Sequence, residues 1–416
     1  TSNNNSSSSS SSSSYLSNIV VIEVNKENLS ITWPYLLLSI RNASFISLDL
    51  ELSGLGIQKG WLAKSFEERY NVIRQSAQSR SVLSVGIATF QLVSRKETDA
   101  KKKLKYKCQV FNILTLCTVP FIVEADGLQF LSKHKFDFNR WINLGIPYGN
   151  DTEKTLWHEV LCAAVPITLH NGLIDLAFIY QHFYSALPET FSEFVVSVSD
   201  WFLLSEGIPG LYDSKYIAEY ITRFKASFLE YVFRKCQREN AIEQARNRLY
   251  VSIEFDFEST ETHLKNTVDI VDCKLPDNFD ASASTESYFI TDEQKNSLCK
   301  RYSVSFPILT FIGDSLLKTV VFKLKILILG CHRAGVDSFM TGFAVVFMQR
   351  MNLLRTGNFD PKCGKFRFYT CNKMALPGTM TPLVLQKSDY VKAVNDHVAK
   401  WTEIERERNR RIELRI

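Results

Sequence analysis

Two carboxylates stand two residues apart in an otherwise apolar segment, FISLDLELSGL, which spans residues 45–55. Alternate residues of a β-strand share a face, so Asp49 and Glu51 would lie side by side. Charged groups on a buried strand are costly unless something pairs with them, and a second like charge raises that cost. A bound divalent cation would resolve the conflict. An exposed strand with both carboxylates in water would also do so, and for an isolated D-x-E pattern this alternative is the commoner one.

Further candidate residues lie where an extended or loop segment is expected to lead into a helix. In LHNGLIDLAF, Asn and Gly end a short apolar strand and a helical periodicity follows, which places Asp175 in the first turn of a helix. In CHRAGVDSFMTGF, His332 and Asp337 precede another apolar helical run. Sites of α/β proteins form at such junctions. Taken alone, Asp175 could cap its helix and His332 could be a structural histidine.

In chain order these segments read D-x-E, D and H-x4-D, and the sequence resembles the DEDD exonucleases of the histidine subclass. Within them it resembles the deadenylase branch that includes poly(A)-specific ribonuclease. The stretches that carry the resemblance include FISLDLELSGLG, LQFLSKHKFDFNRWINLGIPY, LHNGLIDLAFIYQHFYSALPE and HRAGVDSFMTGF. They cover most of residues 31–240 and resume at residue 332.

The resemblance implies a 3′-to-5′ exoribonuclease that hydrolyses RNA with two divalent ions, Mg²⁺ or Mn²⁺. Asp49 would bridge both ions, with Glu51 and Asp337 completing the first. Asp175 would hold the second ion. His332 would take the proton from the attacking water, a role that suits imidazole because it titrates near neutral pH. The implied partners are single-stranded oligo(A) or poly(A) 3′ ends, above all those of small nuclear RNAs, and the product is 5′-AMP.

Three further residues are candidate substrate contacts by the same resemblance. Leu52 and Leu55 follow the D-x-E pair, and Lys215 lies in the motif YDSKY. The competing interpretation is that the leucines belong to the core and that Lys215 is solvated. Asp213 of the same motif is more typical of a turn or a helix cap than of a further metal ligand.

Two functions of other classes remain open. The chain could be a non-catalytic RNA-binding or scaffold protein, in which residues 306–330 disrupt the metal site. It could also be a 3′ exonuclease acting on DNA, since the carboxylate chemistry is the same and the 2′-hydroxyl discriminates the two substrates. Relatives of this kind include homodimers, but no self-complementary surface is legible in the sequence.

Composition is compatible with these functions and selects none of them. The 416 residues can bury one large core with an appended element, and a net charge of +5 suits a polyanionic partner without indicating a polycation. Nine cysteines without a CxxC pair favour reduced thiols in the cytosol or nucleus. The resemblance favours the nucleus, including nucleoli or Cajal bodies, besides the cytoplasm. Charged residues interrupt the apolar stretch 306–329, which argues against a membrane span.

The stretch SLCKRYSVSFP (297–307) resembles the opening of a CCCH zinc finger that relatives carry. After Cys299 the next cysteine is Cys331, so the ligands of a compact finger are missing and no structural zinc is expected. The finger could be lost in this lineage, or residues 306–330 could come from an aberrant splice or gene model.

The expected architecture is a ribonuclease-H-like α/β fold with a mixed central sheet flanked by helices and interrupted by an insertion. The basic run KKKLKYK is expected at a solvated hairpin tip. The expected elements are strands at 44–50, 82–93, 106–116 and 166–169, a helical region at 128–164, and helices at 174–184 and 214–238. The expected divisions are a disordered Ser/Asn-rich tail (1–30), a first exonuclease part (31–240), the insertion (241–330), a second exonuclease part (331–400) and a charged tail (401–416).

Overall fold

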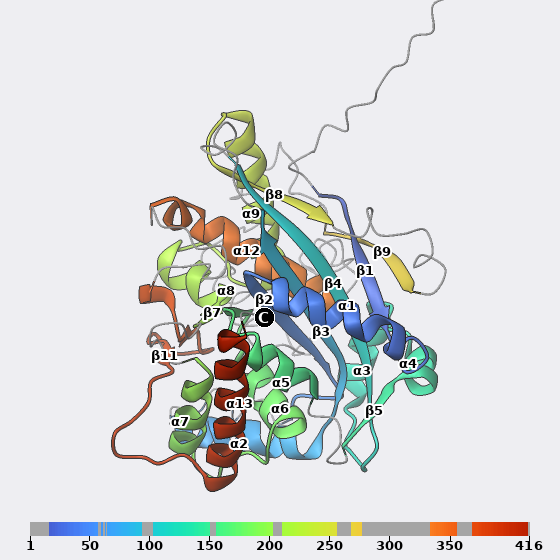
Figure 1. Cartoon of the computed structure of the whole chain (residues 1–416), viewed down its shortest axis with the longest axis vertical. Coiled ribbons are helices and arrows are strands. Elements are labelled where there is room, and N and C mark those ends of the chain that lie inside the picture. Colours follow the sequence, from blue (N-terminus) through green and yellow to red (C-terminus); the bar gives the residue numbers. More distant parts are fainter. Residues whose placement is uncertain are drawn as a thin grey trace, which may run out of the picture.

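The computed structural model describes residues 16–56, 60, 63, 65–93, 103–149, 155–202, 210–255, 268–276, 333–355 and 368–414. A mixed β-sheet crosses its centre, with helices on both faces, so the predicted α/β class is confirmed (Figure 1). The strands are β1 (Asn18–Val24), β2 (Phe45–Leu52), β3 (Val82–Leu92), β4 (Lys103–Cys117), β5 (Ile146–Tyr148), β6 (Ile167–Leu169), β7 (Leu211–Asp213), β8 (Tyr250–Phe255), β9 (Asp269–Lys274), β10 (Lys373–Met374) and β11 (Leu383–Val384). The helices are α1 (Leu29–Asn42), α2 (Phe66–Ser79), α3 (Ala125–Lys133), α4 (Phe138–Leu144), α5 (Thr155–Cys162), α6 (Leu173–Phe183), α7 (Phe191–Trp201), α8 (Ser214–Tyr216), the π-helix η2 (Ile217–Ile221), α9 (Leu229–Ala245), α12 (Ala334–Arg355), the 3-10 helix η5 (Phe368–Thr370) and α13 (Asn395–Glu413).

The strand order of the sheet is β11-β10-β7-β6-β2-β3-β4-β1-β9, and β5 and β8 also pair with β4. Strand β3 is antiparallel to β2 and β4, whereas β6 and β7 are parallel to β2. The order β4-β3-β2-β6-β7 with only β3 reversed is that of a ribonuclease-H-like sheet, so the predicted fold is confirmed. The predicted strands at 44–50, 82–93, 106–116 and 166–169 correspond to β2, β3, β4 and β6.

Strand β4 is long enough to pair with three parallel strands in series. Its residues 103–108 pair with β8, 111–113 with β1 and 115–117 with β5. The basic run therefore lies largely within β4, where Lys105 forms an ion pair with Glu254 of β8 at 2.6 Å. This run had been expected at a hairpin tip, before the strand.

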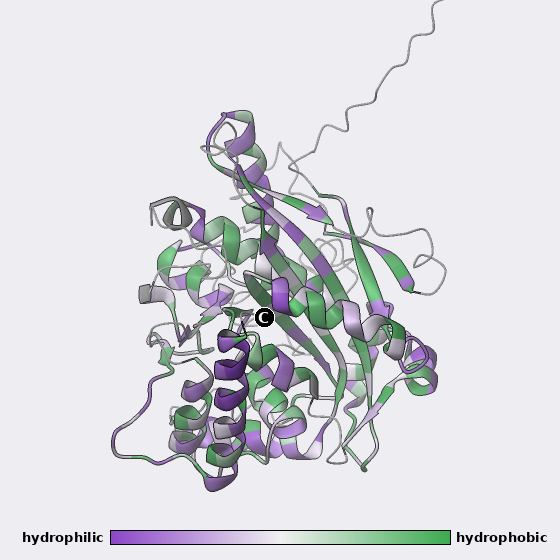
Figure 2. Cartoon of the chain, viewed as in Figure 1, coloured by the Kyte–Doolittle hydropathy of each residue, from purple (hydrophilic) through white to green (hydrophobic). Residues whose placement is uncertain are grey.

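The two faces of the sheet bury separate hydrophobic clusters. One cluster joins the sheet to α1, α2, α5, α6, α7 and α13. The other joins it to η2, α9 and α12. Figure 2 shows hydrophobic residues concentrated on the central strands and alternating with polar residues along them. A sheet covered on both faces needs apolar residues on both sides of its strands, so polar side chains are expected only at selected positions.

The expected divisions of the chain differ from the structure at the N-terminal tail and at the insertion. Residues 18–24 form β1 inside the sheet and α1 begins at Leu29, so the predicted tail does not extend to residue 30. Strands β8 and β9 pair with β4 and β1, so residues 250–255 and 269–274 belong to the central sheet and not to a separate insertion. The zinc-finger remnant and residues 306–330 lie outside the described residues.

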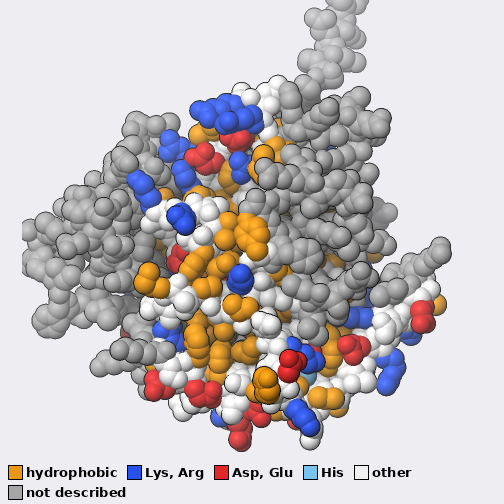
Figure 3. Space-filling view, turned by 90° about the vertical axis from the view of Figure 1, so that its left-hand side faces the viewer, with side chains coloured by type: hydrophobic (Ala, Val, Ile, Leu, Met, Phe, Trp, Pro, Cys, Tyr) orange, Lys and Arg blue, Asp and Glu red, His pale blue; other side chains and the backbone are white. Residues whose placement is uncertain are grey.

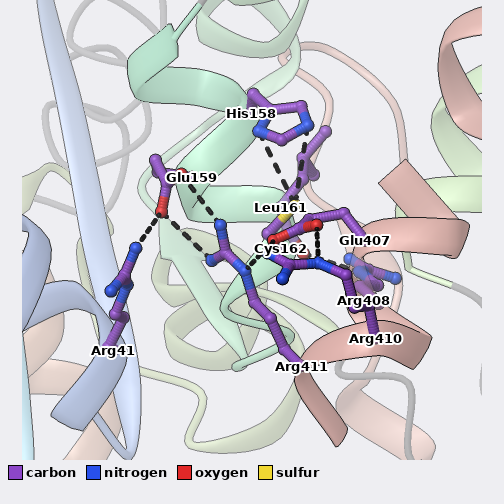
Figure 4. Close-up of polar contacts among 9 residues, drawn as sticks. All are labelled: Arg41, His158, Glu159, Leu161, Cys162, Glu407, Arg408, Arg410 and Arg411. Carbon is purple, nitrogen blue, oxygen red and sulfur yellow. Dashed lines mark hydrogen bonds and ion pairs between the residues drawn. The ribbon is translucent and has the colours of Figure 1, made fainter. Parts of the chain in front are cut away.

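The predicted charged tail from residue 401 is instead most of α13, which packs on the core. Trp401 and Ile404 are buried in the first hydrophobic cluster. Arg411 donates from both terminal nitrogens to Glu159 of α5, at 3.1 and 2.9 Å, and Glu159 also pairs with Arg41 at 3.3 Å (Figure 4). A bidentate pair of this type is geometrically specific, which explains why a helix so rich in charges docks in one place.

Two helical predictions also differ from the structure. The single helix expected over 214–238 is divided into α8, η2 and α9, and Arg223 between η2 and α9 has a φ of 53°, which no right-handed helix tolerates. The helical region expected over 128–164 includes the short strand β5. The helix expected at 174–184 is confirmed as α6.

The face that carries α7 and β11 exposes a number of apolar side chains (Figure 3). A shallow groove between α7 and the segment around β11 is lined in part by Phe191, Val195, Val384 and Val391. Among the helices that the structure describes, none combines the length and apolar character needed to cross a membrane.

Candidate active site

Strand β2 presents Asp49 and Glu51 on the side of the sheet that α12 covers. Leu48 and Leu50, which alternate with them, are buried in the opposite hydrophobic cluster, together with residues of α2 and α6. The alternation follows from the two-residue period of the strand. Glu51 is only 9% exposed, so the strand is not the solvated one that would have explained the D-x-E pattern without a cation.

Helix α12 adds a third carboxylate from the far end of the chain. Asp337 lies in its first turn and is 7% exposed. One carboxylate oxygen from each of Asp49, Glu51 and Asp337 lies within 4.8 Å of the other two. Asp49 and Asp337 are 288 residues apart in the sequence, and the structure brings them together as expected.

A glycine lets α12 begin this close to the sheet. Gly86 of β3 is the cross-strand partner of Asp49. A Cβ atom at Gly86 would lie 1.9 Å from the carbonyl oxygen of Ala334, the first residue of α12. Any other residue at this position would force the start of the helix away from Asp49.

Polar side chains of β1 and β4 hold the segment that leads into α12. Glu23 is 3% exposed and accepts a hydrogen bond from Arg333 at 2.6 Å. Asn112 donates to Glu23 at 3.2 Å and accepts from the backbone N–H of Gly335 at 3.3 Å. Glu23 was not among the predicted site residues, although a carboxylate in the apolar run IVVIEV carries the same signal as Asp49 does.

Asp175 extends the acidic cluster from another direction. It lies in the first turn of α6, as expected. Burial raises the pKa of Asp49 well above its ordinary value, and the charges of Asp337, Asp175 and Glu51 raise it further. Burial also raises the pKa of Asp175 to about 7, against hydrogen bonds from backbone N–H groups that lower it. Four carboxylates therefore interact in one small, mostly buried space.

This donor set fits a divalent cation. Without one, burial and mutual repulsion disfavour the ionised form of Asp49, as its raised pKa records. A cation among the carboxylates would reverse both effects. Hard oxygen donors without cysteine or histidine among the three converging side chains suit Mg²⁺ or Mn²⁺.

The raised pKa values predict how metal and pH act together on stability. The pKa of Asp175 is about 7 in the folded chain, compared with about 3.9 for an aspartate in an unfolded chain. Between these values the folded state holds more protons, so this group's contribution to the free energy of unfolding falls as pH rises. Protons also compete with the metal. We therefore expect Mg²⁺ to raise the Tm more at pH 7.5 than at pH 5.5, each compared with EDTA.

An Asp175→Asn variant provides the control for this measurement, because asparagine cannot ionise. Its difference between the two pH values should be smaller than that of the wild type. An equal Mg²⁺ effect at both pH values, or no effect at either, would contradict the assignment of the cluster as a cation site.

Asp213 connects the loop before α6 to the end of β7. Its fully buried carboxylate accepts hydrogen bonds from the backbone N–H groups of Asn171, Gly172, Lys215 and Tyr216 at 2.8 to 3.3 Å. The prediction of a cap is confirmed. By fixing residues 171 and 172, Asp213 also fixes where α6, and with it Asp175, begins.

Lys215 is buried, so the competing interpretation that it is solvated is wrong, and its role as a substrate contact stays a prediction. It is 2% exposed, and its ammonium group donates to Glu219 at 2.5 Å and to Ser227 at 2.6 Å. Its neighbour Ser214 lies 2.7 Å from Nδ1 of His170, whose pKa is lowered to about 3 by burial and by the charge of Lys215. His170 is therefore neutral at physiological pH.

The remaining predicted residues stay predictions in their roles. Leu52 packs against the first hydrophobic cluster, on the side away from Asp49, which supports the core interpretation for this leucine. Leu55 is half-buried in the loop after β2. His332 lies outside the described residues, directly before Arg333.

Comparison with known proteins identifies relatives. The model of the CAF1 family ribonuclease matches residues 24–156 and 152–345. The chain is 28% identical over 149 residues to the poly(A)-specific ribonuclease PNLDC1 of Mus musculus, which covers 34% of this chain and 28% of the relative. It is 29% identical over 158 residues to the pre-piRNA 3′-exonuclease trimmer of Bombyx mori, with 37% and 28% covered. The matched parts thus span less than a third of these relatives. Among solved structures, the Mg²⁺- and Mn²⁺-bound form of S. pombe Pop2p aligns with a TM-score of 0.40 and 17% identity, covering 52% of this chain and 82% of Pop2p.

Proposed function

The chain belongs to the CAF1 family of ribonucleases, and from this membership we propose that it is a metal-dependent 3′-to-5′ exoribonuclease that shortens RNA tails. The observation that carries the proposal is the convergence of Asp49, Glu51 and Asp337 within 4.8 Å. A cluster of buried like charges is costly, and holding catalytic cations is a function that requires it.

The four carboxylates and His332 have different proposed roles. Asp49, Glu51 and Asp337 would hold one divalent ion, and Asp49 together with Asp175 would hold a second. When bound, such ions polarise the phosphoryl oxygen, lower the pKa of the attacking water and stabilise the departing 3′ oxygen. His332 would accept the proton of that water, a role that the resemblance of the motif HRAGVD implies and that imidazole suits.

For the substrate we propose RNA 3′ ends that carry adenosines, with release of 5′-AMP. Two relatives support 3′-tail trimming: one is named a poly(A)-specific ribonuclease and another a pre-piRNA 3′-exonuclease trimmer. The resemblance in the motifs extends to the nuclear deadenylase called target of early growth response protein one. It therefore favours oligo(A)-extended small nuclear RNAs over polyadenylated messenger RNA, a nuclear location, and a chain that is able to act as a homodimer.

The test is a trimming assay with a 5′-labelled RNA that ends in a run of adenosines, in Mg²⁺ and in EDTA. We expect stepwise shortening from the 3′ end in Mg²⁺ and none in EDTA. Matched substrates with a deoxyadenosine tail and with a uridine tail measure the discrimination of sugar and base. Equal rates on the deoxyribose tail would favour a DNA exonuclease, and tight RNA binding without shortening would favour a non-catalytic RNA-binding protein.

A further inference from the structure

The loop 53–56, which follows the carboxylates of β2, is fastened by the side chain of Glu124. This carboxylate accepts a hydrogen bond from the backbone N–H of Leu55 at 3.0 Å and another from that of Gly56 at 2.8 Å. Glu124 lies directly before α3 and is 68 residues away in sequence from Gly56. Two oxygens of one side chain thus fix two consecutive peptide groups of the loop.

Arg80 supports the carboxylate from the other side. Its Nε donates to Glu124 Oε1 at 2.6 Å, and its Nη2 lies 2.5 Å from the same oxygen. The side chain of Arg80 is 14% exposed and that of Glu124 is 30% exposed, so the pair is partly shielded from water. The ion pair holds Glu124 in the orientation that reaches the loop.

The loop itself is shaped around this contact. A Cβ atom at Gly54 would lie 2.5 Å from Cδ of Glu124, so the glycine gives the carboxylate its space. Gly56 has a φ of +84°, a conformation that favours glycine, and a Cβ there would lie 2.0 Å from Ser76 Oγ. The path of the loop therefore requires both glycines of the segment S-G-L-G, which follows the D-x-E pair.

The start of the loop is buried and its end faces outward. Ser53 is fully buried; its hydroxyl donates to the carbonyl of Ile122 at 2.7 Å and accepts from the N–H of Ser81 at 2.9 Å. Leu55 and Gly56 remain partly exposed. Leu55 is four residues from Glu51 and lies within about 14 Å of it, because an extended chain spans at most about 3.6 Å per residue. Leu55 is therefore close enough to the carboxylates to contact one of the last nucleotides of an RNA bound there.

We propose that Glu124 is a positioning residue for RNA: by holding the backbone of Leu55 and Gly56, with Arg80 as its support, it fixes the wall against which the 3′-terminal nucleotides pack. The inference rests on the proposed ribonuclease function. Glu124 itself touches neither the metal site nor the RNA in this proposal. Its loss should affect the binding of RNA and not the hydrolysis, because Asp49 and Glu51 are held independently by the pairing of β2 with β3.

The test compares KM and kcat for oligo(A) RNA in Glu124→Ala and Glu124→Gln variants. Alanine removes both acceptors and should raise KM roughly tenfold with kcat within about twofold of the wild type, because the loss falls on binding that is common to ground and transition states. Glutamine keeps the volume and one acceptor, and should raise KM by only about threefold. The graded partial rescue by glutamine is the result that a merely structural role would not give.

Glu159→Gln is the matched control. The substitution replaces a carboxylate that, like Glu124, pairs with arginine, here Arg411 and Arg41. Glu159 joins α5 to α13 and α1, whereas Glu124 joins the loop 53–56 to the start of α3. We expect Glu159→Gln to lower the Tm and to leave KM unchanged. As a second readout, the Kd of fluorescently labelled oligo(A), measured by anisotropy in an Asp49→Ala background, should rise with Glu124→Ala by the same factor as KM.

The outcomes separate the two proposals. If the wild type and Glu159→Gln shorten RNA but Glu124→Ala keeps the wild-type KM and Kd, the positioning role is overturned and the ribonuclease stands. If Glu124→Ala only lowers the Tm, as Glu159→Gln does, the role is also overturned. If the wild type does not shorten RNA in Mg²⁺, the proposed function fails and the inference fails with it.

Discussion

An Asp49→Ala variant is expected to lose at least roughly a thousandfold in kcat while it keeps its fold. Metal-ion catalysis is worth several kcal/mol of transition-state stabilisation, and about 4 kcal/mol corresponds to a thousandfold in rate. Asp49 is the carboxylate on which the other three charges of the cluster act, so its loss affects every proposed metal contact. Single-turnover trimming of a 5′-labelled oligo(A) RNA in saturating Mg²⁺ measures the loss.

The same variant should be at least as stable as the wild type when metal is withheld. Removing Asp49 relieves a buried charge of the repulsion from Asp337, Asp175 and Glu51. We expect its Tm in EDTA to be equal to or higher than that of the wild type, with a smaller gain on adding Mg²⁺. Asp272→Asn, an exposed carboxylate of β9, is the control and should change neither quantity. Trimming by Asp49→Ala within tenfold of the wild-type rate would remove Asp49 from the mechanism.

A Gly86→Ala variant is expected to lose both stability and activity. The added methyl group would lie 1.9 Å from the carbonyl oxygen of Ala334, so the start of α12 must move. Overpacking of this kind costs up to about 3 kcal/mol. Asp337 moves with the helix, and a displacement of about 1 Å in a catalytic group costs roughly a hundredfold in rate. Tm by scanning calorimetry and kcat at a temperature well below that Tm measure the two losses separately.

Gly127→Ala is the matched control for this change. A Cβ atom at Gly127 would have its nearest neighbours at 3.9 Å, which is ordinary contact, and the residue lies within α3. Alanine is there expected to be neutral or to stabilise by up to about 1 kcal/mol. Wild-type trimming by a folded Gly86→Ala protein would show that the position of α12 does not govern the site.

The central strands and the acidic site could be predicted because their signals are local. The alternation in FISLDLEL commits Leu48 and Leu50 to one face, and so it commits Asp49 and Glu51 to the other. Asp175 could be placed in a first helical turn because Asn171 and Gly172 interrupt the periodicity before it. Asp337 precedes an apolar run with helical periodicity, which corresponds to α12.

The elements that were missed depend on distant partners. Strand β1 follows a serine tract and takes its place from β4 and β9, about 90 and 250 residues further on. Two arginines of α13, Arg411 and Arg408, pair with Glu159 and with the carbonyl of Leu161, and no local pattern reveals these partners. The need for glycine at position 86 comes from the neighbouring helix α12, which no local pattern of the strand reveals.

Because the chain is synthesised from its N-terminus, β2 leaves the ribosome long before α12 does. At a synthesis rate of about 5–20 residues per second, the 288 residues from Asp49 to Asp337 take roughly 15–60 seconds to appear. During that interval the face of β2 and β3 that α12 will cover, with Phe45, Ala88 and Phe90, has no helix to bury it. The nascent chain therefore carries the strand of Asp49 and Glu51 as an uncovered apolar surface, and we expect chaperones to hold the unfinished chain there.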